Sequence, residues 1–132
     1  ATVLGKSEDA TKYAAAAKQY ADRYNALYFN EKDLNYQGKT QAANLMPLSL
    51  GLVPDAMKAQ VAKNVADDVK NHGNHLTTGF IASQMLLPRL SEFGYHDLAY
   101  QVVDETIRAS KAPGATVQIF MVSDGKPLFG AD

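Results

Sequence analysis

The chain has 132 residues, of which 46% are hydrophobic, so it carries enough apolar material for the core of one ordinary domain. Its 13 basic and 14 acidic residues leave a formal net charge of −1, and no two Lys or Arg residues are adjacent, which argues against a nucleic acid as partner. The absence of cysteine excludes disulfides, thiolate metal sites and a cysteine nucleophile.

Membrane insertion is not expected, because the longest largely apolar run, residues 79–87, is far shorter than the roughly 20 residues that a spanning helix needs. The chain begins at Ala1 without a basic and then apolar leader, which favours a processed protein or an excised fragment. Its cellular compartment stays open on these grounds.

Residues 7–27 predict one amphipathic helix. Ser7 is expected as its N-cap, with Glu8 and Asp9 placed where the helix dipole favours negative charge. Tyrosine, alanine and leucine then recur at spacings of three and four residues, which predicts a single buried face. The stretch 29–39 contains Asn, Asp and Gly without helical period and is expected to form a loop.

Two further helices are expected to be buried on all sides. One begins near Thr40 and contains Pro47, and the other lies within residues 77–94; both are apolar around most of their circumference. Residues 52–73 and 95–110 each predict a helix with a single apolar stripe, and the first of these should stop at its terminal glycine, residue 73.

The helices therefore alternate in the order outer, inner, outer, inner, outer. A small free-standing bundle gives each helix one wet face, whereas an inner ring of helices sheathed by an outer ring needs helices that are apolar all round. We predict an all-α fold, an α/α-barrel (toroid) fragment of about five helices, over residues 1–110. Residues 111–132, in which Val117, Ile119 and Met121 follow an alternating pattern, are expected to form a short extended or strand-like tail.

The segment NHGNHLTTGF, residues 71–80, concentrates residues that can carry chemistry. Gly73 interrupts the helical spacing of His72 and His75, and no Asp, Glu or Cys is placed nearby to complete a ligand shell. We therefore expect no metal site here, and no cofactor is implied.

The two adjacent threonines of this segment have two interpretations. A hydroxyl nucleophile needs a base that a third group holds in position, which one neighbouring histidine does not show. We therefore expect Thr77 or Thr78 to cap the helix that follows, with Gly79 allowing a close approach of the backbone. This interpretation leaves His75 without a role.

Four segments occur together in order and at a specific spacing. They are YFN (28–30), YQGKTQAANLMPLSLGLVP (36–54), NHLTTGF (74–80) and LPRLSEFGYHDLAY (87–100). Together they resemble the catalytic domain of the α-L-rhamnosidases of glycoside hydrolase family 78, and the resemblance covers about residues 12–103. It implies part of an (α/α)6 barrel, in agreement with the alternation of helices. It also implies a parent enzyme that hydrolyses terminal α-L-rhamnosidic bonds by inversion, with a rhamnose-containing glycan as substrate.

In such barrels the substrate pocket lies where the loops enter the inner helices, here at YQGKTQ and NHLTTG. The resemblance thus implies a substrate-binding role for His75, with Thr77, Thr78, Tyr36 and Gln41 as its neighbours.

The catalytic carboxyl groups are not found in this chain. Inverting glycosidases need two of them about 6.5–9.5 Å apart, one as acid and one as base. The acidic pairs 8–9, 67–68 and 104–105 fall on predicted outer helices, and Glu92 is the one acidic residue on a buried helix. In the family the acid lies upstream of the matched region and the base in a GATT-WE type segment, whereas residues 114–120 here read GATVQIF. We therefore expect no catalytic residue and no activity from the chain alone. The chain is then either a piece of a larger rhamnosidase or a diverged or truncated relative that has lost the chemistry.

Other functions stay open. A barrel fragment exposes the apolar sides of its inner helices, so we expect self-association. A non-catalytic helical module would instead bind a glycan or a protein partner, with Tyr36, His75 and Tyr95 offering stacking and hydrogen bonds to a sugar. A purely structural interaction domain is the third reading. The compartment of a parent enzyme is open too, with the periplasm and secretion as options.

Overall fold

Two helical hairpins form the body of the protein, which a computed structural model describes over residues 1–111. The first pairs α2 (Gln41–Ser49) with α3 (Lys58–Asn71), and the second pairs α4 (Phe80–Glu92) with α5 (His96–Ser110). Because α2 also packs on α4, the hairpins meet through their first helices. The all-α prediction is confirmed. The predicted tail lies, from residue 112 onward, outside the described residues.

A long helix and a small β-hairpin precede this body. A short 3-10 helix, Thr2–Leu4, leads into α1 (Ser7–Tyr28), and the strands β1 (Phe29–Asn30) and β2 (Asn35–Tyr36) follow. The strands are antiparallel, with Phe29 opposite Tyr36. We predicted a loop here and missed the hairpin, because strands of two residues show no period. The rings of Phe29 and Tyr36, with centroids 5.0 Å apart, stabilise the pairing.

The start of α1 differs in detail from the prediction. Lys6, not Ser7, is the N-cap, and its carbonyl oxygen accepts a hydrogen bond from the Ala10 amide at 3.0 Å. No side chain caps this helix, and Ser7 is its first helical residue. Glu8 and Asp9 do lie in that turn, as expected from the helix dipole.

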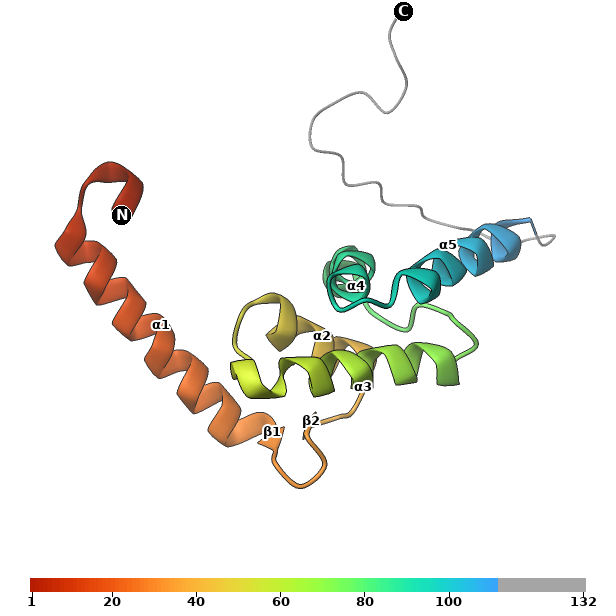
Figure 1. Ribbon diagram of the computed structural model, residues 1–132, viewed down its shortest axis with the longest axis horizontal. Helices are drawn as coiled ribbons and strands as arrows, with labels where there is room; N and C mark the ends of the chain where they lie inside the picture. The colour runs from red at the N-terminus through yellow and green to blue at the C-terminus, as the bar shows by residue number, and fades with distance from the viewer. Residues whose placement is uncertain (112–132) are drawn as a thin grey trace, which may run out of the picture.

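The predicted buried face of α1 is wrong for this chain. No residue of α1 is buried, and Tyr13, Tyr20 and Leu27 are 63%, 72% and 62% exposed. The physical reason is the position of the helix, which projects away from the two hairpins (Figure 1). Its attachment lies near its C-terminal end, where the rings of Tyr24 and Tyr36 have centroids 5.8 Å apart.

Three of the helices end in the same glycine turn. In α3 the Gly73 backbone has a φ of 64°, a left-handed conformation that costs a residue with a side chain more than it costs glycine. The amide of Asn74 then donates to the carbonyl oxygen of Val69 at 2.9 Å, which satisfies a carbonyl that the helix leaves free. α2 and α4 end in the same way at Gly51 and Gly94. The predicted stop at Gly73 is confirmed.

The main core lies between the four helices of the hairpins. Its central side chains are each no more than 1% exposed, and they are Leu45, Val65, Val69, Leu86 and Val102. A second cluster joins the β-hairpin to α2 and α3 through Tyr36, Leu48, Val53 and Val61. The single apolar stripe predicted for this helix is therefore confirmed, and its valines, Val61, Val65 and Val69, face the two clusters.

The helices predicted to be buried all round are not so in this chain. Met46 on α2 and Leu50 at its end are 37% and 59% exposed, and Phe80 and Ile81 at the start of α4 are 61% and 63% exposed. Two hairpins leave their first helices without the neighbours that a closed ring would supply. Within residues 1–111, none of the helices combines the length and apolar character needed to cross a bilayer.

Candidate functional site

Two loops converge on the first turn of α2. The β-hairpin runs directly into this turn, and residues 72–79 lie against it although they are more than 30 positions further along the chain. Thr40 is extended (φ −89°, ψ 167°), and its side-chain oxygen accepts a hydrogen bond from the Ala43 amide at 3.2 Å. This N-cap fixes the beginning of the helix on which both loops are held.

The side chain of Gln41 connects α2 to the loop before α4. Its Nε2 donates to the carbonyl oxygen of His75 at 3.0 Å, and its Oε1 accepts from the amide of Thr77 at 3.0 Å. Gln41 is 0% exposed. The structure thus brings Gln41 to His75 and Thr77, and both contacts are to the main chain of the loop.

Asn44 makes the corresponding connection to the β-hairpin. Its Oδ1 accepts from the Tyr36 amide at 3.2 Å, while its Nδ2 donates to Oδ1 of Asn35 at 2.8 Å. Asn44 is 1% exposed. Sequence reasoning missed this residue, although a carboxamide inside an otherwise apolar helix is a signal, because a buried polar group requires a partner.

Tyr36 lies inside the protein. It is 1% exposed, and its hydroxyl donates to Oδ1 of Asn25 at 2.6 Å. Burial of the phenol, and to a smaller extent the neighbouring Tyr24, raise the pKa of Tyr36 to about 12. The ring therefore packs in the interior, within the second core cluster.

The side chains of His75 and Thr77 face outward from the 72–79 loop. His75 and Thr77 are exposed, and within residues 1–111 neither the imidazole nor the Thr77 hydroxyl has a hydrogen-bond partner. Thr78 is half-buried and its hydroxyl lies 2.8 Å from that of Ser83. The role of these residues in binding a substrate stays a prediction.

Two expectations for the start of α4 were wrong. Gly79 is the N-cap, and neither Thr77 nor Thr78 caps the helix through its side chain. The Thr78 hydroxyl pairs instead with Ser83, which also donates to the carbonyl oxygen of Gly79 at 3.0 Å. Gly79 allows no close approach either, because a Cβ atom placed there meets nothing within 4 Å.

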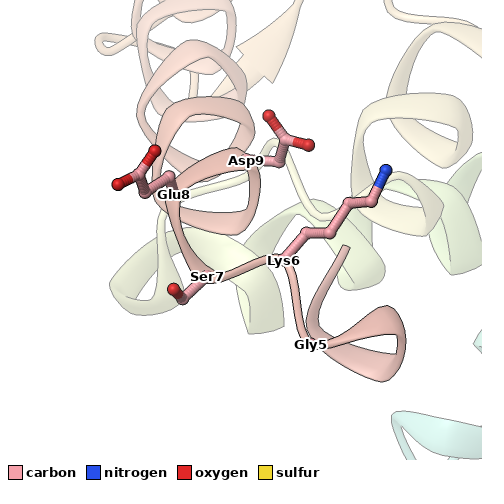
Figure 2. A pocket seen from close by; sticks show the side chains of 5 residues that line it. All are labelled: Gly5, Lys6, Ser7, Glu8 and Asp9. Carbon is pink, nitrogen blue, oxygen red and sulfur yellow. The ribbon is translucent and has the colours of Figure 1, made fainter.

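Two surface hollows are open to solvent. One, of about 380 Å³, lies beside the β-hairpin and is lined by Leu27, Tyr28, Phe29, Asn30, Asn35, Tyr36, Gln37, Gly38 and Lys39. The other, of about 320 Å³, is formed by Gly5–Asp9 at the start of α1 (Figure 2). Among residues 1–111 the second hollow is lined by one continuous turn. Of the two, the first is the one that adjoins the converging loops.

Most acidic side chains near the site or on the helices are already paired with bases. Asp22 lies 2.7 Å from Lys18 and Asp104 lies 2.8 Å from Arg108. The other pairs with Lys or Arg among residues 1–111 are Asp33 with Lys39, Asp55 with Lys58, Asp67 with Lys63, Glu92 with Arg89, and Glu105 with Arg108. In the part of the chain that the structure describes, no three His, Asp or Glu side chains gather in a way that would hold a metal.

Asp68 differs from these residues. Its side chain is 19% exposed and lies at the end of α3, where Oδ2 is 3.3 Å from Nδ1 of His72. The same imidazole nitrogen lies 2.8 Å from the Asp68 carbonyl oxygen. Oδ2 is buried without a hydrogen bond of good geometry. Asp68 is also the acidic residue nearest in sequence to the 72–79 loop.

Comparison with known proteins gives one consistent match. The family model described as the bacterial alpha-L-rhamnosidase 6 hairpin glycosidase domain matches residues 1–113. An alpha-L-rhamnosidase of Streptomyces avermitilis is 33% identical over 105 residues, which is 80% of this chain and 10% of that protein. One of Alteromonas sp. is 34% identical over 102 residues, 76% of this chain and 11% of that protein. The chain thus spans about a tenth of the length of these relatives.

Solved structures agree with this match. The crystal structure of the Streptomyces avermitilis alpha-L-rhamnosidase complexed with L-rhamnose aligns with a TM-score of 0.74 at 28% identity, over 90% of this chain and 13% of that one. The native Aspergillus terreus enzyme aligns with the same TM-score at 23% identity, over 85% and 12%, and supports the fold alone. The predicted all-α barrel fragment is confirmed, with two hairpins among the described residues.

Proposed function

This chain belongs to the bacterial α-L-rhamnosidase six-hairpin glycosidase family, and we propose that it is one sector of the barrel of an enzyme that hydrolyses terminal α-L-rhamnosidic bonds by inversion. The observation that carries this proposal is the convergence of two loops on the first turn of α2. In an α/α barrel such loops border the substrate pocket at one end of the inner helices. The ligand of the parent enzyme is then a rhamnose-containing glycan.

Within this sector the substrate-facing groups belong to the 72–79 loop. The exposed imidazole of His75 and the hydroxyl of Thr77 are unpaired within residues 1–111, which suits hydrogen bonds to sugar hydroxyls. Thr78 supports the loop through Ser83. Tyr36 and Gln41 are buried, so we infer that they contribute to substrate binding only through the position of the loops.

We infer that the chain by itself lacks the pair of carboxyl groups that inversion requires. This inference is supported by Glu92, which is the one acidic residue on α2 or α4. It lies in the last turn of α4 and is paired with Arg89. That end of α4 is opposite to the loops. We therefore expect the acid and the base to come from other parts of the parent enzyme.

Hydrolysis of a chromogenic α-L-rhamnoside tests this function. We expect no turnover above the uncatalysed rate from the chain alone, whereas the full-length Streptomyces avermitilis enzyme serves as the positive control. Hydrolysis that disappears in Asp68→Asn would show that this chain contains a catalytic carboxylate after all. Asp22→Asn, at an exposed ion pair, is the matched control.

A non-catalytic glycan-binding module is the second candidate. It is favoured by the hollow beside the β-hairpin, in which Tyr28 offers an aromatic face and Asn30 and Gln37 offer carboxamides. Titration of the chain with L-rhamnose, followed by amide chemical shifts, distinguishes this candidate. Saturable shifts confined to the hairpin and residues 75–78 support it, and their absence leaves a structural role.

We also propose that the exposed apolar sides of α2 and α4 drive self-association of the isolated chain. Leu50 and Ile81 are 59% and 63% exposed, and large exposed apolar patches are uncommon on monomers. In the parent enzyme, neighbouring hairpins of the barrel would cover the same side chains.

A further inference from the structure

The side chain of Gln41 is paired with the main chain of the 72–79 loop in the manner of a neighbouring strand. Its donor faces a carbonyl oxygen, that of His75, and its acceptor faces an amide, that of Thr77, with both distances 3.0 Å. A flipped carboxamide would place its NH2 group against the Thr77 amide, donor against donor, and its oxygen against the His75 carbonyl oxygen, acceptor against acceptor. The arrangement therefore specifies one orientation of the side chain and one path for residues 75–77.

Its burial separates Gln41 from a residue that contacts a ligand. Gln41 is 0% exposed, whereas His75 and Thr77, whose main chain it holds, have exposed side chains. The loop is thus fixed from below and presents its polar side chains above. Asn44 holds the β-hairpin through Tyr36 and Asn35 from the same turn of helix, so the two loops have a common support.

We propose that Gln41 is a positioning residue that sets the main chain of residues 75–77, and with it the directions of the His75 and Thr77 side chains, relative to the β-hairpin. This role rests on the proposed function in one respect, which is that the loop would present a polar surface to sugar hydroxyls. The positioning itself is a property of this chain and is measured without substrate.

Amide hydrogen exchange of the full 132-residue chain tests the proposal. Gln41→Leu removes both hydrogen bonds at similar volume, and we expect protection of the Thr77 amide to fall about tenfold or more while Val65 and Ala66 in α3 keep theirs. Gln19→Leu, an exposed position on α1, is the matched control. Protection of Thr77 within about twofold of the unsubstituted chain would overturn the proposal.

Gln41→Glu provides the decisive second variant if the leucine variant does not fold. At pH 7 its carboxylate faces the His75 carbonyl oxygen, so two acceptors oppose each other and we expect the loop to open. At about pH 4 the buried carboxyl group is protonated and donates to the same oxygen, so protection relative to the unsubstituted chain at that pH should return. Equal protection at the two pH values, each expressed as a ratio to the unsubstituted chain at the same pH, would contradict the assignment.

The same samples keep the two proposals distinguishable. Loss of Thr77 protection in both variants, together with no response of His75 to L-rhamnose in the unsubstituted chain, would support the positioning role and count against glycan binding. The opposite outcome has two parts: the chemical-shift response to L-rhamnose is the same in Gln41→Leu as in the unsubstituted chain, and the Thr77 amide is equally protected in both. That outcome would overturn the positioning role and leave the proposed function intact.

Discussion

The hydroxyl of Tyr36 donates a 2.6 Å hydrogen bond to Oδ1 of Asn25, and Nδ2 of Asn25 donates at 2.7 Å to the carbonyl oxygen of Leu52. One carboxamide thus links α1, the β-hairpin and the segment between α2 and α3. No residue of α1 is buried, so these bonds and the ring of Tyr24 make up much of the attachment of that helix.

We expect Asn25→Ala to lower the free energy of unfolding by about 2–4 kcal/mol, because it leaves the buried Tyr36 hydroxyl and the Leu52 carbonyl without their partner. Urea denaturation followed by circular dichroism measures the change. Gln19→Ala, on the exposed surface of the same helix, is the control and should stay within about 0.5 kcal/mol of the unsubstituted chain. Equal stability of the two variants would show that α1 is held by other contacts.

The raised pKa of the Tyr36 phenol leads us to expect a loss of stability at high pH. Its pKa is raised from 10.0 to about 12 in the folded protein, so the folded state favours the neutral phenol. The resulting stability is fully present below pH 10 and is lost as the pH rises to about 12. We expect the unsubstituted chain to lose stability more steeply over this window than Tyr36→Phe. Parallel stability curves for the two proteins would contradict this expectation.

The side chain of Thr40 should contribute to stability through its hydrogen bond at the N-terminus of α2. We expect Thr40→Ala to lower the free energy of unfolding by about 0.5–2 kcal/mol, because the amide of Ala43 loses its acceptor. Thr40→Ser keeps the hydroxyl and should retain most of that stability. Chemical denaturation of both variants measures the difference, and an alanine variant as stable as the serine variant would exclude a capping role.

The exposed apolar sides of α2 and α4 predict association in solution. Light scattering of the isolated chain should give the mass of a dimer, and Leu50→Glu or Ile81→Glu should shift it toward the mass of a monomer, because burial of an unpaired carboxylate is costly. Gln84→Glu, an exposed polar position on α4, is the matched control. A monomeric unsubstituted chain would show that these side chains tolerate water and that the proposed association is wrong.

The parts of the fold that follow from local patterns could be predicted. The valines of α3 recur at four-residue spacing and Gly73 follows the last of them, so both the buried face and the end of that helix were correct. The β-hairpin could not be found in this way, because its strands have two residues each and depend on one pair of rings. The exposure of α1 could not be predicted either, because periodicity indicates that one face of a helix is apolar but does not specify what covers that face.

The candidate site shows the same division. The resemblance placed YQGKTQ and NHLTTG on one surface, and the bonds of Gln41 to His75 and Thr77 join these two segments. The roles of the individual side chains did not follow, because a carboxamide in a sequence does not reveal whether it faces solvent or a main chain 34 positions away. Asn44 was overlooked for that reason.

The two loops that α2 supports differ in how their length can vary. Residues 31–33 at the tip of the β-hairpin lie beyond the bonds of Asn44 to Asn35 and Tyr36, so an inserted residue there leaves those bonds in place. An insertion between His75 and Thr77 separates the two main-chain groups that a single side chain holds. Related chains should therefore vary in length at the hairpin tip while keeping a constant spacing across residues 75–77.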